Sequence, residues 1–279
     1  APFLTLGTVE IPFLLFLLLG GGVFFSIYSR FVPFKYFSHG VKILMGKYND
    51  PNDPGEITHF QALTSALAST VGLGNISGVA IAIQMGGPGA LFWMWVSALL
   101  GMSTKFFSCT LSILYRGKDD QGQIQGGPMY YIENGLGKRF KPLSILFSLA
   151  GLIGCTVMFQ SNQLADIIRD QVFLPNNMFV ENALIGDFLQ GLIMATLTGI
   201  VIFGGIQRIG QVASYLVPIM VILYLLSGLL VIFNHLTDIP SLFALIVNDA
   251  FTGDAVMGGA VGAVIIAGVR RALFSNEAG

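Results

Sequence analysis

The residues best suited to bind a ligand lie in one uncharged segment, residues 64–83. Gly72 and Gly74 flank Leu73 near its middle, and Asn75 follows at once. Each glycine costs a helix about 1 kcal/mol relative to alanine, so the pair favours unwinding. Inside a membrane, a break of this kind persists only where it lines a protein cavity or holds a ligand. The segment therefore predicts a binding site at a broken helix.

The chemistry of such a break suits an anion and a cation. Freed amide groups attract a carboxylate. Freed carbonyl groups, with hydroxyl groups from Ser69 or Thr70 and the amide oxygen of Asn75, suit a small hard cation such as sodium. A second interpretation is that Gly72, Gly74 and the small residues around them only let helices pack closely. That interpretation leaves Asn75 and the adjoining hydroxyl groups unexplained.

A second polar group lies in the apolar segment 143–168, where Thr156, Gln160 and Gln163 share one helix face. A polar stripe within a membrane span is costly, so it should face a cavity rather than lipid. There Gln160 and Gln163 could bind the amino group of a substrate or shape its pocket. The alternative is hydrogen bonding between helices that only holds the bundle together.

The composition indicates that membrane helices position these residues. The 279 residues are 54% hydrophobic and 10% charged, with a mean hydropathy of +0.75, whereas a soluble domain carries about 25% charged residues. The net charge of −1 offers no basic surface for nucleic acid. Cys109 and Cys155 lie inside apolar runs, without metal-ligand spacing. No nucleophile, histidine and carboxylate share a plausible site within the membrane, so we expect no enzyme.

Apolar runs long enough to cross a membrane recur seven times. Helices are expected in them because strand-like alternation is absent and lipid excludes unpaired backbone. The predicted fold class is an all-α membrane bundle, with spans near residues 11–29, 58–85, 89–115, 143–168, 185–206, 211–233 and 255–274.

Basic residues predict the orientation of the spans, since cytoplasmic loops carry an excess of lysine and arginine. Arg169 stands apart from the others, where it can pair with Asp166 at i,i+3 spacing. The remaining loop residues fall on one side and place the N-terminus outside the cytoplasmic (inner) membrane; they are Arg30, Lys35, Lys42, Lys47, Arg116, Lys118, Lys138, Arg139, Lys141, Arg208, Arg270 and Arg271.

Two aromatic segments lie near predicted span ends. Residues 126–137 place aromatic and apolar side chains between glycine and proline breakers, which predicts either a short helix at the membrane interface or a loop packed under the bundle. Trp93 and Trp95 begin a span directly after residues 86–89, Gly-Gly-Pro-Gly, where an aromatic belt at the interface is expected.

Several motifs resemble known transporters. Residues 71–75, Val-Gly-Leu-Gly-Asn, resemble the unwound first core helix of the neurotransmitter:sodium symporters. The chain also resembles the alanine/glycine:cation symporter family from about residue 49 to its end. The motifs that carry this second resemblance are GGPGALFWMW at 86–95, GGPMYYIE at 126–133 and FSNEAG at 274–279.

The resemblance implies a fold with one extra helix followed by two inverted five-helix repeats. Residues 1–57 would hold the extra helix and a cytoplasmic loop, residues 58–234 the first repeat, and residues 235–279 the first helix of a truncated second repeat. The four remaining helices would belong to a missing C-terminal half. That half is an expected partner, because alternating access needs both repeats.

The resemblance also implies roles for individual residues. Main-chain amide groups of Leu73 and Gly74 would meet the substrate carboxylate, and Thr70 and Asn75 would ligate one sodium ion. The predicted substrate site comprises Gly72, Leu73, Gly74, Asn75, Gln160 and Gln163. The predicted sodium ligands comprise Thr70, Asn75 and, for a second ion, the carbonyl groups of Ala68 and Val71.

Taken with the resemblance, the sequence predicts sodium-coupled symport of a small neutral amino acid, alanine or glycine, by alternating access. Sodium is co-transported, and membrane lipid surrounds the chain. An ion channel would instead use a continuous pore with repeated rings of carbonyl or charged groups. A sensor or scaffold derived from a transporter would give neither saturable uptake nor current.

Overall fold

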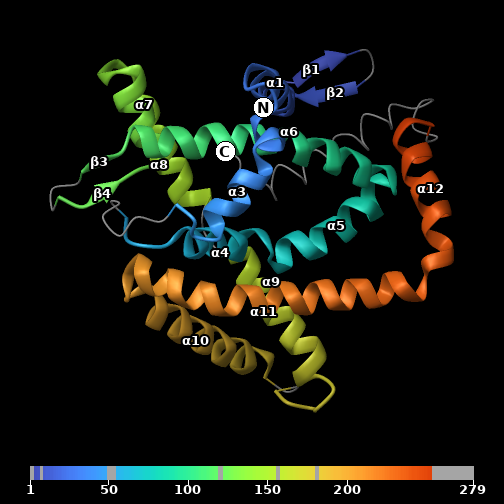
Figure 1. The fold of residues 1–279 in the computed structure, drawn as a ribbon. Helices are drawn as coiled ribbons and strands as arrows, with labels where there is room; N and C mark the ends of the chain where they lie inside the picture. Colours follow the sequence, from blue (N-terminus) through green and yellow to red (C-terminus); the bar gives the residue numbers. More distant parts are fainter. Residues whose placement is uncertain are drawn as a thin grey trace. The chain divides into compact units, whose positions relative to one another are not determined.

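Figure 1 shows a computed structural model that describes residues 3–6, 9–48, 55–118, 122–154, 158–179 and 182–252. Helices dominate these residues. Two short antiparallel hairpins accompany them, one made by β1 (Phe3–Leu6) and β2 (Val9–Pro12) and one by β3 (Gly117–Lys118) and β4 (Ile124–Gln125). The helical content confirms the predicted all-α class.

Helices occupy six of the seven predicted spans, and the seventh, 255–274, lies outside the described residues. Four spans contain one helix each: α1 (Phe13–Tyr28), α6 (Gly89–Leu114), α10 (Ala183–Ile202) and α11 (Gly205–Asn234). Two spans contain two helices: α4 (His59–Thr70) with α5 (Leu73–Gly86), and α8 (Lys141–Gly154) with α9 (Met158–Ile168).

Shorter helices lie between the spans. They are α2 (Val32–Lys35), α3 (Phe37–Leu44), α7 (Pro128–Leu136), η1 (Lys138–Phe140), the π-helical turn η2 (Arg169–Phe173), η3 (Leu236–Asp238) and α12 (Ile239–Thr252). The helix α12 has no counterpart among the predicted spans, since 14 residues are too few to cross a membrane.

The size of buried and exposed side chains is typical of a membrane protein. Within the described residues, α6, α11 and residues 184–202 of α10 are long and apolar enough to cross a membrane. Most buried side chains are small: Ser26, Thr64, Ala82, Ala90, Ser97, Ser103, Ala213 and Ala250. The exposed side chains of α10 and α11 include many large apolar ones, among them Leu184, Phe188, Leu197, Leu216, Leu223 and Leu230. Lipid accommodates such a surface, and small residues allow close helix packing.

The chain divides into two compact units. Unit 1 contains residues 1–40, 78–153 and 230–279, and α1, α7 and α12 all pack on its helix α6. The buried hydroxyl groups of Ser26 in α1 and Ser103 in α6 hydrogen-bond at 2.9 Å. A Cβ atom added at Gly22 would lie 3.0 Å from Cβ of Leu100, so a small residue permits this helix contact.

Unit 2 contains residues 41–77 and 154–229. The helix α4 begins in a capping box, in which Thr58 and Gln61 each bind the other's main-chain amide through a side-chain oxygen at 3.2 and 3.0 Å. The buried Gly210 of α11 lies close to this end, because an added Cβ atom would stand 3.2 Å from Ile57. These contacts anchor the first half of the segment predicted to break.

Residues 128–136 of the segment 126–137 form the helix α7, so a helix rather than a loop is present there. It packs on α6, and Asn134 Nδ2 donates a hydrogen bond to the Tyr115 carbonyl at 3.3 Å. Ser144 Oγ of α8 donates to the Met129 carbonyl at 3.0 Å. Burial raises the pKa of the Tyr131 hydroxyl, with Cys109 as a smaller cause. The segment is therefore a helix packed against protein.

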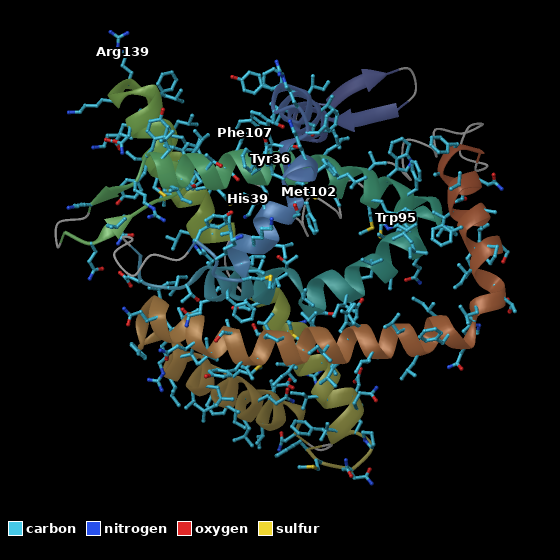
Figure 2. The ribbon with its side chains drawn as sticks, in the orientation of Figure 1. Tyr36, His39, Trp95, Met102, Phe107 and Arg139 are labelled. Atoms are coloured by element: carbon cyan, nitrogen blue, oxygen red, sulfur yellow. The ribbon has the colours of Figure 1, made fainter. Side chains whose placement is uncertain are left out.

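Trp93 and Trp95 pack on α12. The prediction of an aromatic belt at the membrane interface did not include this contact. Trp93 is half-buried, and its Nε1 donates to the Ala250 carbonyl at 3.3 Å. Trp95, which is labelled in Figure 2, is 40% exposed, and its ring centroid lies 5.9 Å from that of Phe243. The N-terminal end of α6 is thus covered by protein.

Candidate functional site

The predicted break in the segment 64–83 is present. The helix α4 ends at Thr70 and α5 begins at Leu73, so Val71 and Gly72 lie outside both helices. Val71 has φ −93° and ψ 75°, which are not helical values. The break is therefore narrower than the interval between the two glycines, because Gly74 already belongs to α5.

Opposite ends of two helix dipoles meet at this break. The Val71 N–H donates to the Leu67 carbonyl at 2.8 Å, so the carbonyl groups from Ala68 to Val71 lie beyond the hydrogen bonds of α4 itself. The Ile76 N–H donates to the Gly72 carbonyl at 3.0 Å, so the amide groups of residues 73–75 form the open first turn of α5. Carbonyl groups favour a cation and amide groups favour an anion.

No charged side chain of the two helices competes at these ends. The last turn of α4 contains no basic residue, and the first turn of α5 contains no acidic residue. A helix N-terminus carries a partial positive charge that an anion stabilises. The first turn of α5 contains no carboxylate that could serve as this anion.

The structure describes the Thr70 side chain at the break. Thr70 Oγ1 donates a hydrogen bond to the Ala66 carbonyl at 3.0 Å, which directs the proton of the hydroxyl along α4. A hydroxyl that donates in this way still carries oxygen lone pairs, which are what a cation binds. The side chains of Ser69, Leu73 and Asn75 lie outside the described residues.

The polar stripe of the span 143–168 is described only in part. Gln163 is half-buried on α9, in the same unit as α4, whereas Thr156 and the side chain of Gln160 lie outside the described residues. The predicted substrate role of the two glutamines is therefore still a prediction.

Arg169 pairs mainly with a residue that the sequence analysis did not name. Its Nη1 lies 3.9 Å from Asp166, the predicted partner, but its Nε donates to Asp187 at 3.2 Å and its Nη2 forms a second bond to the same carboxylate. The hydrogen bond and the negative charge of Asp187 raise the pKa of Arg169 above its usual value, and the charge of Asp166 contributes less. The pair joins η2 to α10 and is a structural brace.

Gln190 of α10 is a polar residue that sequence patterns did not single out. Its side chain is 5% exposed, and neither its Oε1 nor its Nε2 has a hydrogen-bond partner among the described residues. A buried amide of this kind is commonly satisfied by an ordered water. Nothing in the local sequence separates it from its apolar neighbours except its side-chain type.

Comparison with known proteins identifies the family of this chain. Residues 5–279 match the sodium:alanine symporter family. The chain is 39% identical to the sodium/alanine symporter AgcS of Methanococcus maripaludis, over 96% of this chain and 58% of the relative. It is 38% identical to the amino-acid carrier protein AlsT of Bacillus subtilis, over 96% of this chain and 54% of the relative.

A third relative has a different named substrate. The chain is 39% identical to the probable sodium/glutamine symporter GlnT of Bacillus subtilis, over 95% of this chain and 53% of that protein. The chain thus spans just over half the length of these curated relatives. The matches confirm the family predicted from the motifs, the multi-pass membrane location and the expectation that the chain is not an enzyme. This chain belongs to the sodium:alanine symporter family.

Proposed function

We propose that the protein containing this chain carries out sodium-coupled symport of a small neutral amino acid, alanine or glycine, by alternating access. The observation that supports this most is the two-residue break between α4 and α5, in a membrane family of symporters. A break inside an apolar segment needs ligands or protein groups for its exposed backbone.

The substrate carboxylate binds at the N-terminal end of α5. The amide groups of Leu73 and Gly74 point along the helix axis toward the break, next to Gly72. Because no acidic residue occupies this first turn, the carboxylate of an amino acid supplies the anion that the helix dipole favours. The amino group is bound by Gln160 and Gln163 on α9.

Sodium binds at the C-terminal end of α4. Thr70 and Asn75 supply side-chain oxygens for one ion, and the carbonyl groups of Ala68 and Val71 contribute to a second. The segment 64–83 contains no acidic residue, so the positive charge of sodium is balanced largely by the substrate carboxylate at the same break. Each ligand therefore favours binding of the other, which is a reciprocal coupling free energy.

The fold expected for the whole protein is one extra helix followed by two inverted five-helix repeats, with residues 1–57, 58–234 and 235–279 in the roles given above and the N-terminus outside the inner membrane. The comparisons do not support a missing C-terminal half as a partner, since the relatives align over 96% of this chain. A channel, sensor or scaffold is the alternative function, and the names of the relatives favour transport.

Uptake in liposomes tests this proposal. The full-length product of the gene that carries these residues is reconstituted, and labelled alanine uptake is measured with an inward sodium gradient and again with choline in place of sodium. We expect saturable uptake that requires sodium and falls about tenfold or more in Asn75→Ala, since one ion ligand is lost. Uptake that is unchanged both without sodium and in Asn75→Ala would overturn the proposal that the break binds the substrate and sodium.

Glycine and glutamine, each in excess over labelled alanine, then define the substrate. Competition by glycine but not by glutamine supports a small pocket. Competition by glutamine would instead align this protein with the relative named for glutamine.

A further inference from the structure

The N-terminal end of α6 receives a carboxylate from a distant part of unit 1. Asp249 Oδ2, near the end of α12, accepts a hydrogen bond from the Gly89 N–H at 2.6 Å. The residue before the helix, Pro88, supplies no side-chain cap. Asp249 therefore caps a helix that begins 160 residues earlier in the chain, and a charge-assisted bond to a helix N-terminus is among the stronger contacts of this type.

Glycine is required for this approach. Gly87 has a φ of +76°, and a Cβ atom added there would stand 2.6 Å from Asp249 Oδ2. A Cβ atom added at Gly89 would stand 2.6 Å from the Asp249 carbonyl carbon, which is main chain and cannot move aside. The two glycines thus form a seat into which the end of α12 fits.

Aromatic contacts close the seat. Trp93 Nε1 donates to the Ala250 carbonyl at 3.3 Å, and the ring of Phe251 packs edge-on against Phe92 and Trp93 at centroid distances of 5.0 and 5.8 Å. Ala250 is completely buried between them. Opening the seat would separate a carboxylate, an amide and an indole from their partners, which is costly away from water.

The seat also holds the end of α5. This helix runs from the break to Gly86, and the turn that follows it is Gly87 and Pro88. Ala82 of α5 is buried against Met94 of α6. The helix α5 thus ends directly at the seat, and it runs without interruption from its first turn at Leu73.

We propose that Asp249 is a positioning residue: it clamps α12 on the N-terminal end of α6, and this clamp stays closed throughout the transport cycle. The inference rests on the proposed function of the break. The clamp fixes the end of α5 that adjoins α6, and α5 is the helix whose first turn is proposed to offer amide groups to the substrate carboxylate.

A crosslink across the seat tests whether it stays closed. In the full-length protein, with native cysteines replaced by serine, Phe92→Cys and Phe251→Cys are joined with a short bis(methanethiosulfonate) reagent, which links them through disulfides that a reductant cleaves. We expect the crosslinked protein to keep the sodium-driven alanine uptake of the same variant before crosslinking. Loss of uptake that a reductant restores would overturn the clamp, because α12 would then be a lid that has to open.

Kinetics of Asp249 variants test positioning. We expect Asp249→Ala to raise the KM for alanine about tenfold, while the sodium dependence at saturating alanine stays that of the natural protein. Asp249→Asn keeps an acceptor oxygen and should restore most of the affinity. The matched control Asp238→Ala, at an exposed residue of η3 directly before α12, should leave KM unchanged. An unchanged KM in a folded Asp249→Ala protein would overturn the inference.

The two proposals fail in different ways. Absence of sodium-dependent uptake by the natural protein refutes the proposed function. Sodium-dependent uptake by the natural protein, together with loss of uptake on crosslinking, leaves the proposed function standing and overturns only the clamp. If Asp249→Ala does not reach the membrane, the crosslinked pair and Asp249→Asn decide.

Discussion

The N-terminal ends of two consecutive helices, α5 and α6, differ in the acidic groups near them. Both α5 and α6 begin next to glycine, at Leu73 and Gly89. The first amide of α6 is bound by the Asp249 carboxylate, whereas the first turn of α5 contains no acidic residue. Because every helix N-terminus favours an anion, we expect the contrast to separate a structural end, at α6, from the end proposed to bind the substrate, at α5.

The difference teaches that glycine alone does not define a site. At Gly87 and Gly89 the missing side chains admit the main chain of α12, so the space is filled by protein. At Val71 and Gly72 the missing helical bonds expose carbonyl and amide groups of two dipoles. A remote carboxylate, rather than the local sequence, distinguishes the two.

A carboxylate built into α5 should abolish the contrast and give the largest effect. In Asn75→Asp the new charge takes the place proposed for the substrate carboxylate, and like charges at one site cost several kcal/mol. We expect alanine affinity to fall about 100-fold, with no loss of thermal stability because the dipole favours the new charge.

Alanine-dependent thermal stabilisation in detergent measures this effect. Asn75→Ala is the control, since it removes the amide without adding a charge and should weaken binding less. If Asn75→Asp binds alanine with the same affinity as the natural protein, no substrate carboxylate binds at this end of α5.

A methyl group at the α6 end should disrupt the structure. In Gly89→Ala the new Cβ atom meets the main chain of Asp249, so we expect the free energy of unfolding to fall by about 1–3 kcal/mol. Gly191→Ala in α10 is the matched control, because nothing lies within 4 Å of its added Cβ atom. Equal melting temperatures for the two variants would mean that the seat is not closely packed.

Removal of the hydroxyl on the α4 side should affect the cation. Thr70→Val has nearly the same shape but no hydroxyl oxygen, so we expect sodium affinity to fall about tenfold. Thr70→Ser keeps the oxygen and should bind sodium nearly as the natural protein does. Sodium titration of alanine uptake measures both, and equal affinities for Thr70→Val and Thr70→Ser would exclude the hydroxyl as a ligand.

The smallest effect is expected from neutralising the α6 cap. Asp249→Asn keeps an acceptor but loses the charge, so stability should fall by less than about 1 kcal/mol. The loss should shrink in high salt if the dipole is its cause. A change in melting temperature as large as that of Gly89→Ala would contradict this account of the cap.

Much of the fold could be predicted because lipid allows few structures. Six spans followed from hydropathy, and the pair Gly72 and Gly74 located the break to within two residues. The helix α12 was missed because its apolar run is too short for a span and lies between two longer ones. The packing of α12 on α6 could not be predicted either, since uniformly apolar helix surfaces do not indicate which helices pack together.

The sequence points to a candidate site only where the chemistry is local. The small polar residues around Thr70 indicate a cation, and the glycines beside them indicate exposed backbone. The contacts of Asp249 with Gly89 and of Asp187 with Arg169 join residues far apart in the chain. No spacing rule relates such residues, so sequence patterns assigned Arg169 to its neighbour Asp166.

The most direct test of the central claim compares alanine with alaninamide, which lacks the carboxylate but keeps the amino group and side chain. Sodium-dependent binding to the full-length protein is measured by calorimetry for both compounds. We predict that alaninamide binds about 100-fold more weakly, since a charge-assisted contact with the N-terminal end of α5 is lost. Equal affinity for the two compounds would contradict the claim that a substrate carboxylate binds there.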